Sequence, residues 1–499
     1  MEKLPLRAGL KSAPVPFLLL AACVFLMNTQ HGIPIPAGKN VIHLGLVDIL
    51  IWVTFGVWVV SGLNGKSRFR PKLPFAFAAI PVVSAASLLW ASPAGKPAAA
   101  KEIFQLVEYF IVAPLLILNL AGSRARLRGL LSVFLLAVTL VVAWGLLDYA
   151  AGRNVLGPSP DYVAGIFNAG GAFGNINALG VFFAIALPVA FGVALFDDIK
   201  PLARISLIVP VAAGAAITLS GAALAALLAA LLLALGLRNR RTLLPAGVAV
   251  VLAGIMFLPL VLRADHSAIV TNSAAVYLDD NFLLTPDQML QRAEKLTADG
   301  RDFDAHRLLL RIDDRDALTP HGEALLEKVE QNIQGRELPG SVLPADRPVV
   351  AVRYKRWQAA LKAIRTKLWG HGLSTFQKSL AYGAIPKYGY NTDEPEAFNL
   401  GIDQPDTFNR FLIAAVETGL PGLLAFIWFY IYGLSSAVGL FGSAKGGFAR
   451  GVAGGATASL AFLPIVAAYS DVLVRGAALP LVFIICCVRI LADEETKTE

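Results

Sequence analysis

The sequence is poor in charge: only 16% of its residues are Asp, Glu, Lys or Arg, against 56% hydrophobic residues. Soluble domains carry roughly a quarter charged residues, so this composition excludes a soluble globular protein and indicates a polytopic membrane protein. Cysteine is scarce, and Cys23, Cys486 and Cys487 all lie in apolar runs, which argues against a disulfide framework or a cysteine metal site. The 6 histidines show no zinc spacing. We expect no metal and no cofactor.

The net charge of +8 does not indicate a nucleic-acid partner, because the cations lie mostly in short loops between apolar runs. An apolar run of about 20 residues can cross the hydrocarbon core as a helix. The run 202–237 is too long for one span, and Ser220-Gly221 divides it into two short helices of a hairpin. We predict an all-α protein of about twelve spans, near 14–30, 41–62, 73–91, 103–121, 127–150, 174–196, 202–237 (two), 242–262, 408–434, 451–470 and 475–491.

Lysine and arginine gather in alternate loops, near 66–72, 124–128, 200–204, 238–241 and 445–450. Cytoplasmic loops of membrane proteins carry such an excess. With about twelve spans, every basic loop and both termini then lie on the cytoplasmic face. The long hydrophilic loop 263–407, between the ninth and tenth spans, lies outside the cytoplasm.

The predicted domains are an N-terminal membrane domain (1–262, about nine spans), an acidic helical insertion (263–346), a basic loop (347–407) and a C-terminal membrane domain (408–499, three spans). In the insertion, Pro286 begins one helix and Gly300 ends it. Its apolar spacing is that of a single tetratricopeptide-type unit, although a small helical insertion packed on the outer surface is favoured. Residues 279–346 are a candidate surface for a protein partner.

The basic loop concentrates positive charge, with eight Lys or Arg and no Asp or Glu in 349–392. One helical face is predicted there, followed by Gly370 and Gly372 as the helix end. Arginine side chains suit phosphate because the planar guanidinium donates two parallel hydrogen bonds. The alternative is a basic helix lying on anionic lipid headgroups, which charge alone favours. The residues of the predicted face are Arg353, Trp357, Ala360 and Ile364.

An acid lies near the start of the next apolar run, where Glu417 is followed by Gly419, Pro421 and Gly422. An acid at membrane depth is costly unless it faces a polar cavity. Irregular backbone at that depth needs cover from protein or a water-filled cavity. We therefore expect an outward-opening cavity beneath the basic helix, suited to a lipid-linked phosphate.

The order and spacing of three motifs resemble those of the O-antigen ligase and O-antigen polymerase superfamily. The motifs are Arg-x-x-x-Trp-x-x-Ala-Leu at 353–361, Gly-x-Gly-x-x-x-Phe at 370–376, and Asn-x-Phe-Leu-x-x-x-x-Glu-Thr-Gly-Leu-Pro-Gly at 409–422. Residues 172–180 look like the family's Gly-x-Phe-x-Asn-Pro-Asn element, and 218–221 lie where the family has a hairpin turn. The positions that we expect to be structural or substrate-lining are Asn177, Ser220, Trp357, Gly370, Gly372, Asn409 and Gly419.

The resemblance implies a GT-C-like, metal-independent glycosyltransferase in the bacterial inner membrane. Such enzymes move a glycan from undecaprenyl diphosphate to an acceptor hydroxyl, on lipid A–core for ligases or on another repeat unit for polymerases. The diphosphate leaves as an anion, so fixed cations near its oxygens lower the barrier. We expect Arg353 to supply that charge, supported by Lys355 and Arg356.

The sequence departs from the family pattern where a base is needed, because Phe408 replaces the usual histidine before Asn409. The family's arginine after the hairpin serine is also absent. The candidate acceptors for the hydroxyl proton are Asp406, His371 and Glu417. Asp406 could equally be a helix N-cap, and His371, flanked by glycines, is more often a turn residue.

Two rival functions remain. In a transporter or flippase for a lipid-linked sugar, intramembrane acids such as Asp48 and Glu108 would be ion or proton sites, although we find no inverted repeat. A catalytically inactive scaffold would act through the insertion. The missing histidine and the large insertion favour an exopolysaccharide or surface-polysaccharide polymerase, or a divergent ligase for lipopolysaccharide.

Overall fold

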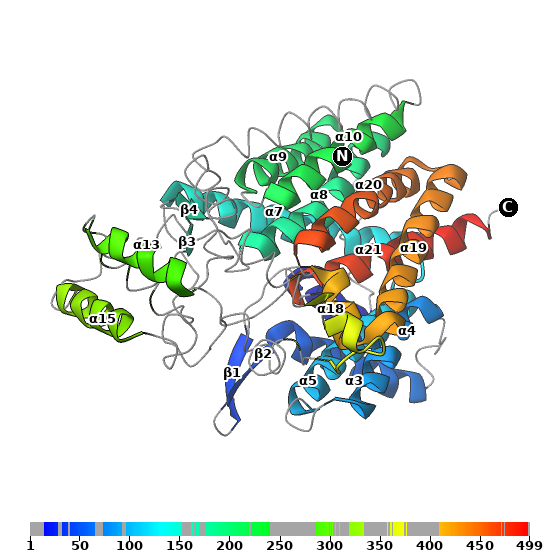
Figure 1. The fold of residues 1–499 in the computed structure, drawn as a ribbon. Coiled ribbons are helices and arrows are strands. Elements are labelled where there is room, and N and C mark those ends of the chain that lie inside the picture. The colour runs from blue at the N-terminus through cyan, green and yellow to red at the C-terminus, as the bar shows by residue number, and fades with distance from the viewer. Residues whose placement is uncertain are drawn as a thin grey trace.

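The computed structural model is dominated by helices packed side by side (Figure 1). It describes residues 14–27, 32–37, 40–64, 73–91, 96–151, 161–163, 166–168, 176–218, 221–239, 286–298, 300, 302, 305, 309, 319–333, 357, 360–361, 363–373, 376, 409–470, 472–473 and 475–497.

The first half of the bundle contains α2 (Val15–Leu26), α3 (Leu46–Leu63), α4 (Phe75–Ala86), α5 (Lys96–Val107), α6 (Ala113–Leu120) and α7 (Arg124–Ala151). A 3-10 turn, η1 (Ser87–Leu89), extends α4, and a π-helical turn, η2 (Glu108–Val112), joins α5 to α6. Two short antiparallel hairpins accompany these helices. In one, β1 (Gly32–Ala37) pairs with β2 (Asn40–Gly45), and in the other β3 (Asp161–Val163) pairs with β4 (Ile166–Asn168).

The second half contains α8 (Ile176–Phe196), α9 (Pro201–Ile217), α10 (Gly221–Arg238), α18 (Arg410–Glu417), α19 (Gly419–Ser443), α20 (Gly447–Tyr469) and α21 (Arg475–Glu495). Proline occupies the first turn of both α2 and α9, where its missing amide costs no hydrogen bond. The predicted division of 202–237 is confirmed, since α9 ends at Ile217 and α10 begins at Gly221.

The helical, multi-pass membrane class is confirmed by helices that are long and apolar enough to cross a bilayer. Within the described residues there are 6 of these: Leu46–Leu63, Ala99–Leu120, Arg124–Asp148, Ala178–Phe196, Gly419–Ser443 and Gly447–Ala468. Shorter apolar helices cover Val15–Leu26, Phe75–Leu89, Pro201–Ala215 and Ala223–Arg238. The predicted span 242–262 lies outside the described residues, so the number of spans stays a prediction.

Two predicted spans had wrong limits. The span expected at 41–62 begins with β2, and α3 starts only at Leu46, where Asp48 Oδ2 accepts a 3.0 Å hydrogen bond from the Gly45 amide and stabilises the new helix end. The span expected at 408–434 is two helices, divided at Gly419, where the sequence predicted irregular backbone. The chain breaks between α18 and α19 because Gly419 has a φ of +74°, and α19 then continues to Ser443.

The π-helical turn η2 has a local cause in Pro114. A regular helix would place the proline ring against the carbonyl of Phe110, and proline has no amide to bond it. One extra residue in the turn relieves this crowding. Glu108, Tyr109 and Phe110, three consecutive residues of this turn, are all buried.

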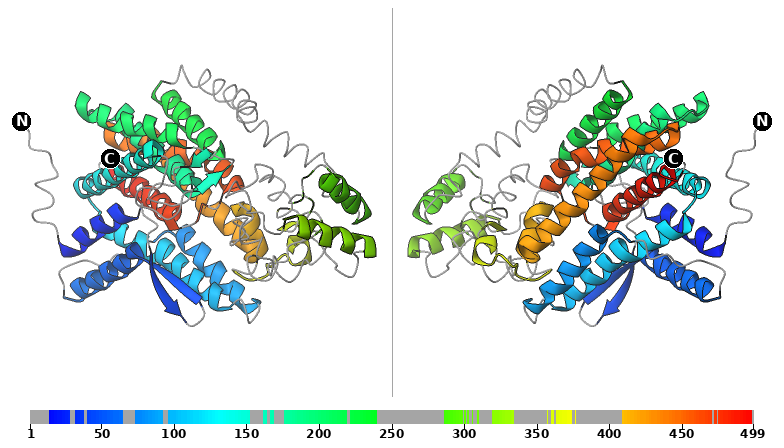
Figure 2. Two further views of the ribbon diagram at one scale, coloured as in Figure 1. Left: turned by 90° about the vertical axis from the view of Figure 1, so that its left-hand side faces the viewer. Right: turned by 90° about the vertical axis from the view of Figure 1, so that its right-hand side faces the viewer.

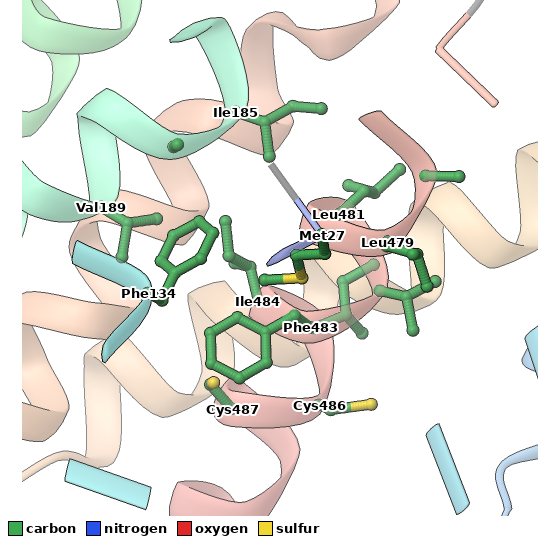
Figure 3. Packing of buried hydrophobic residues seen from close by; sticks show 14 of the residues in the cluster. Met27, Phe134, Ile185, Val189, Leu479, Leu481, Phe483, Ile484, Cys486 and Cys487 are labelled. Carbon is green, nitrogen blue, oxygen red and sulfur yellow. The ribbon is translucent and has the colours of Figure 1, made fainter. Parts of the chain in front are cut away.

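The core of the bundle surrounds α21. Nearly every side chain from Ala477 to Leu491 is buried, as expected for a helix that is apolar on all sides. The rings of Phe483 and Phe134 of α7 lie 5.1 Å apart between centroids. Figure 3 shows the same cluster with Met27, Ile185, Val189 and Ile484.

The helices α8 and α20 approach so closely that glycine is required between them. A Cβ at Gly192 would lie 2.4 Å from the carbonyl oxygen of Gly451, and a Cβ at Gly455 would lie 2.5 Å from that of Pro188. Small residues allow membrane helices to pack backbone against backbone. This pair therefore packs backbone against backbone.

One end of the bundle collects basic residues. Here the Arg124 amide donates a 2.7 Å hydrogen bond to Glu494 Oε1, which ties the start of α7 to the end of α21. Arg128 Nη2 lies 2.7 Å from Asp197 Oδ2, just beyond the end of α8. We call this the basic end. It brings together loops that the charge pattern assigns to one side of the membrane.

The helix α19 connects the basic end to the opposite end. A Cβ at Gly446, three residues beyond α19, would lie 2.2 Å from Arg124 Nη2, so the helix finishes at the basic end. Its 25 residues span about 37 Å. Gly419, at the start of α19, therefore lies at the far end, which we call the site end.

The described part of the insertion is helical. Its helices α13 (Pro286–Ala298) and α15 (Pro320–Ile333) stand apart from the membrane helices in Figure 2. They enclose buried apolar side chains of Ala293, Leu309 and Val329. The predicted helix limits at Pro286 and Gly300 are confirmed, since Gly300 has a φ of +73° just after α13.

Candidate functional site

The junction between α18 and α19 is the framework of the site. Asn409 Oδ1 accepts a 3.1 Å hydrogen bond from the Leu412 amide, so Asn409 is the N-cap of α18. Of the two roles expected for Asn409, structural or substrate-lining, this bond supports a structural one. The helix ends eight residues later at Glu417, and its last carbonyls need partners from elsewhere.

A segment of the basic loop supplies those partners. The His371 amide donates to the Val416 carbonyl and the Gly372 amide to the Glu417 carbonyl, each at 2.8 Å. In return the Leu420 amide, in the first turn of α19, donates to the Leu368 carbonyl at 2.9 Å. The loop and the helix junction thus complete each other's backbone hydrogen bonds, and we call residues 368–373, together with Phe376, the seated loop.

Glycine makes this close fit feasible. Gly370 and Gly372 have φ values of +86° and +106°, in the left-handed region that favours glycine. A Cβ at Gly370 would lie 2.5 Å from the Glu417 carbonyl oxygen, and one at Gly419 would lie 2.3 Å from the Trp369 carbonyl carbon. The predicted helix end at Gly370 and Gly372 is confirmed, and the backbone approach explains the glycines.

The Glu417 side chain faces the seated loop. It is only 4% exposed, and its Oε1 accepts a 3.2 Å hydrogen bond from the Phe376 amide. A buried carboxylate is stabilised by amide donors, which also fix the position of the chain that carries them. Glu417 therefore holds the loop through both its side chain and its own carbonyl.

The half-buried His371 side chain also bonds to backbone. Its Nε2 lies 3.0 Å from the Ala363 carbonyl oxygen, and a carbonyl can only accept, so Nε2 carries the proton. Thr366 Oγ1 donates to the same carbonyl at 2.7 Å. His371 thus links the seated loop to the helix before it.

The helical segment before the seated loop packs on α18 by the predicted face. Ala360 is buried and Ile364 half-buried, in an apolar cluster with Phe376, Ile413 and Val416. Trp357 is half-buried, whereas Arg365 is exposed. The predicted orientation is confirmed for Ala360 and Ile364. The described part of the basic helix therefore packs on α18 at the site end.

Two residues of the site were missed from the sequence, and both follow α4. The Ser87 hydroxyl donates to the Ser84 carbonyl at 2.7 Å and accepts a 3.1 Å hydrogen bond from the Leu373 amide. A Cβ at Gly372 would lie 2.5 Å from that of Ala91. The seated loop is therefore held between the α18–α19 junction on one side and η1 on the other.

The structure unites six of the predicted site residues: His371, Glu417, Gly370, Gly372, Asn409 and Gly419. Others lie outside the described residues and stay predictions, namely Arg353, Lys355, Arg356, Asp406 and Ser220. The backbone of Asn177 lies in the first turn of α8.

The acids of the transporter hypothesis, Asp48 and Glu108, have structural partners. Tyr109 donates to Asp48 Oδ1 at 3.4 Å, and the Trp52 indole donates to Glu108 Oε2 at 3.1 Å. Both acids are buried among the first helices of the bundle. Each acid therefore has a hydrogen-bonding partner within the bundle.

The geometry can be compared with known families. A family model described as O-antigen ligase matches residues 205–427. The matched range includes α10, the insertion, the seated loop and α18, and it ends within α19. No curated protein matches the chain. The predicted resemblance to the O-antigen ligase and polymerase superfamily is therefore confirmed.

Proposed function

We propose that this chain, which carries an O-antigen ligase domain over residues 205–427, is a membrane glycosyltransferase that uses a lipid-linked glycan. The donor is a saccharide on undecaprenyl diphosphate. The acceptor is a hydroxyl of lipid A–core in a ligase, or of another repeat unit in a polymerase. Transfer takes place at the site end, outside the cytoplasm of the bacterial inner membrane.

One observation carries the proposal: the matched domain contains a hydrogen-bonded unit of the seated loop with α18 and α19. Its bonds from His371 and Gly372 to the end of α18 fix the loop at the site end. A glycosyl transfer needs such a rigid frame, because donor and acceptor must be held in reactive geometry.

The orientation is supported by the basic end. Lysine and arginine are enriched in cytoplasmic loops, so the basic end faces the cytoplasm and the site end faces outward. The guanidinium of Arg126 lies 5.9 Å from the ring centroid of Phe17, which brings the start of α2 to the same end. α21 also finishes there, through Glu494, which supports the proposal that both termini are cytoplasmic.

The chemical roles follow from what each group can donate or accept. Arg353, with Lys355 and Arg356, stabilises the departing diphosphate by fixed positive charge, and this step requires no metal. Asp406 accepts the proton of the attacking hydroxyl. One observation favours Asp406: the N-cap of α18 is already supplied by Asn409, so Asp406 is not needed for that role.

The test is a transfer assay with the full-length protein in lipid nanodiscs. It receives an undecaprenyl-diphosphate oligosaccharide and an acceptor, with a chelator present, and release of undecaprenyl diphosphate is measured. We expect chelator-resistant release that Arg353→Ala abolishes and that Asp406→Asn lowers by about 10²–10⁴-fold. Lys328→Ala, which removes an equal charge from the exposed surface of α15, is the matched control and leaves release unchanged. Product length then separates polymerase from ligase.

Two results would contradict the proposal. Full turnover in Arg353→Ala removes that residue from the mechanism, and no release across a panel of donors and acceptors removes glycosyl transfer. An inactive scaffold predicts a different pattern: its biological activity survives Arg353→Ala but is lost when residues 279–346 are deleted.

A further inference from the structure

One side of α19 carries a stripe of exposed apolar side chains. Its other face is buried in the bundle and includes Ala425, Phe426 and Phe429. In a membrane-spanning helix, an exposed apolar stripe faces the hydrocarbon of the bilayer. The exposed residues recur at helical spacing and are Leu420, Leu424, Trp428, Ile431 and Val438.

The seated loop extends this stripe beyond the end of the helix. The Leu420 amide, at the outer end of the stripe, donates a 2.9 Å hydrogen bond to the Leu368 carbonyl. The next residue, Trp369, packs its backbone against Gly419. Yet the residues Leu368 and Trp369 are 54% and 67% exposed. A large apolar side chain at the border of the membrane is typical of residues that enter the lipid interface.

The residues before this turn are amphipathic in the same direction. Ala360, Ala363 and Ile364 pack on α18, while Leu361 and Arg365 lie on the exposed side. Lysine and arginine beside exposed apolar groups suit the phosphates of lipid headgroups, which they reach with long side chains. No acid lies in 349–392 to oppose that attraction.

We infer that Leu361 and residues 363–369 dock on the outer leaflet of the bilayer. Leu368 and Trp369 enter the interface beside Leu420, and Arg365 and Lys367 contact lipid phosphates. The choice of leaflet rests on the proposed orientation, whereas contact with lipid rests on the exposed stripe. Continuity with the lipid-facing side of α19 identifies the bilayer, not a soluble protein, as the occupant of this surface.

This contact gives the site a fixed height above the membrane. The same backbone that carries Leu368 and Trp369 continues directly into Gly370–Gly372 of the seated loop. A donor whose diphosphate lies in the headgroup layer therefore meets the loop at its own depth. Lipid contact is part of how the loop is positioned, in addition to its protein hydrogen bonds.

The experiment places a nitroxide label at position 369 through Trp369→Cys in the full-length protein in nanodiscs. Its collision rates with oxygen, which concentrates in lipid, and with a water-soluble nickel chelate are measured. Leu424→Cys, on the lipid-facing stripe, is the lipid control, and Glu327→Cys, on the exposed side of α15, is the water control. Cys23, Cys486 and Cys487 are buried, and the unsubstituted protein measures their background labelling.

We expect the ratio of oxygen to nickel collisions at position 369 to be several-fold above that at 327 and close to that at 424. A ratio equal to that at 327 would overturn the inference. Low collision rates with both reagents would also overturn it, since they indicate cover by protein. Leu368→Cys is an independent second position with the same expectation. The measurement needs no turnover, so it stands whether or not glycosyl transfer is found.

Discussion

The hydroxyl of Ser87 accepts a hydrogen bond from the amide of Leu373, which lies 286 positions further along the chain. This bond joins η1, in the first half of the bundle, to the seated loop. Ser87 lies before residue 205, where the O-antigen ligase match begins. The site is therefore built partly from a membrane helix outside the matched domain.

Replacing Ser87 by alanine should loosen the seated loop. The buried Leu373 amide would lose its acceptor, at a cost of about 1–3 kcal/mol. We expect a lower melting temperature in detergent, faster proteolysis near residue 373 and reduced transfer. Ser435→Ala is the matched control, because Ser435 bonds only locally, to the Tyr432 carbonyl on the exposed side of α19. Equal behaviour of the two variants would mean that the Ser87 bond does not hold the loop.

Gly419 should not tolerate a side chain. Alanine at a φ of +74° is strained by about 1–2 kcal/mol, and its Cβ would in addition press on the Trp369 backbone. Gly419→Ala should therefore displace the loop and abolish transfer. Gly439→Ala, in the same helix with open space around the new methyl group, should keep both stability and transfer. Transfer in Gly419→Ala at the wild-type rate would show that the loop can move without loss.

Glu417 can be assigned by comparing two replacements. Glutamine keeps a carbonyl oxygen that can accept from the Phe376 amide, whereas alanine removes the acceptor. If Glu417 positions the loop, Glu417→Gln should retain turnover within a few-fold and Glu417→Ala should lose most of it. If Glu417 is the general base, both variants lose turnover alike. Steady-state kcat for the two variants decides between these roles.

His371 can be tested in the same way. Glutamine can keep an N–H donor toward the Ala363 carbonyl, whereas phenylalanine cannot. A positioning role predicts that His371→Gln keeps the wild-type pH profile of kcat and that His371→Phe lowers kcat with the same profile. If His371 is instead the general base, His371→Gln should change the pH profile of kcat, since a neutral amide cannot take up the proton. In that case one limb of the pH profile would disappear in His371→Gln.

The features that were predicted from the sequence depend on neighbouring residues. The helix end at Gly370 and Gly372 could be predicted because the helical spacing of apolar residues stops there and glycine favours a helix end. The break at Gly419 follows from the same conformational preference of glycine. The buried face of Ala360 and Ile364 follows from helical spacing alone.

The features that were missed depend on contacts between distant segments. Ser87 stands in an apolar run like many other membrane serines, and nothing near it signals the Leu373 amide. The strand before α3 was missed because the apolar residues Val41, Ile42 and Leu44 lead directly into the apolar helix and hide the boundary. Asp406 and Arg353 could be predicted only from the family resemblance.

The π-helical turn at Glu108–Val112 sets the number of residues that the chain needs between α5 and α6. Each residue of a regular helix rotates the next by about 100°, so one residue fewer in this turn would swing all of α6 around its axis. Leu116 and Ile117 would then leave the core, and polar Asn119 would face another direction. Length variation among relatives of this protein should therefore be absent from 108–120, even where individual side chains differ.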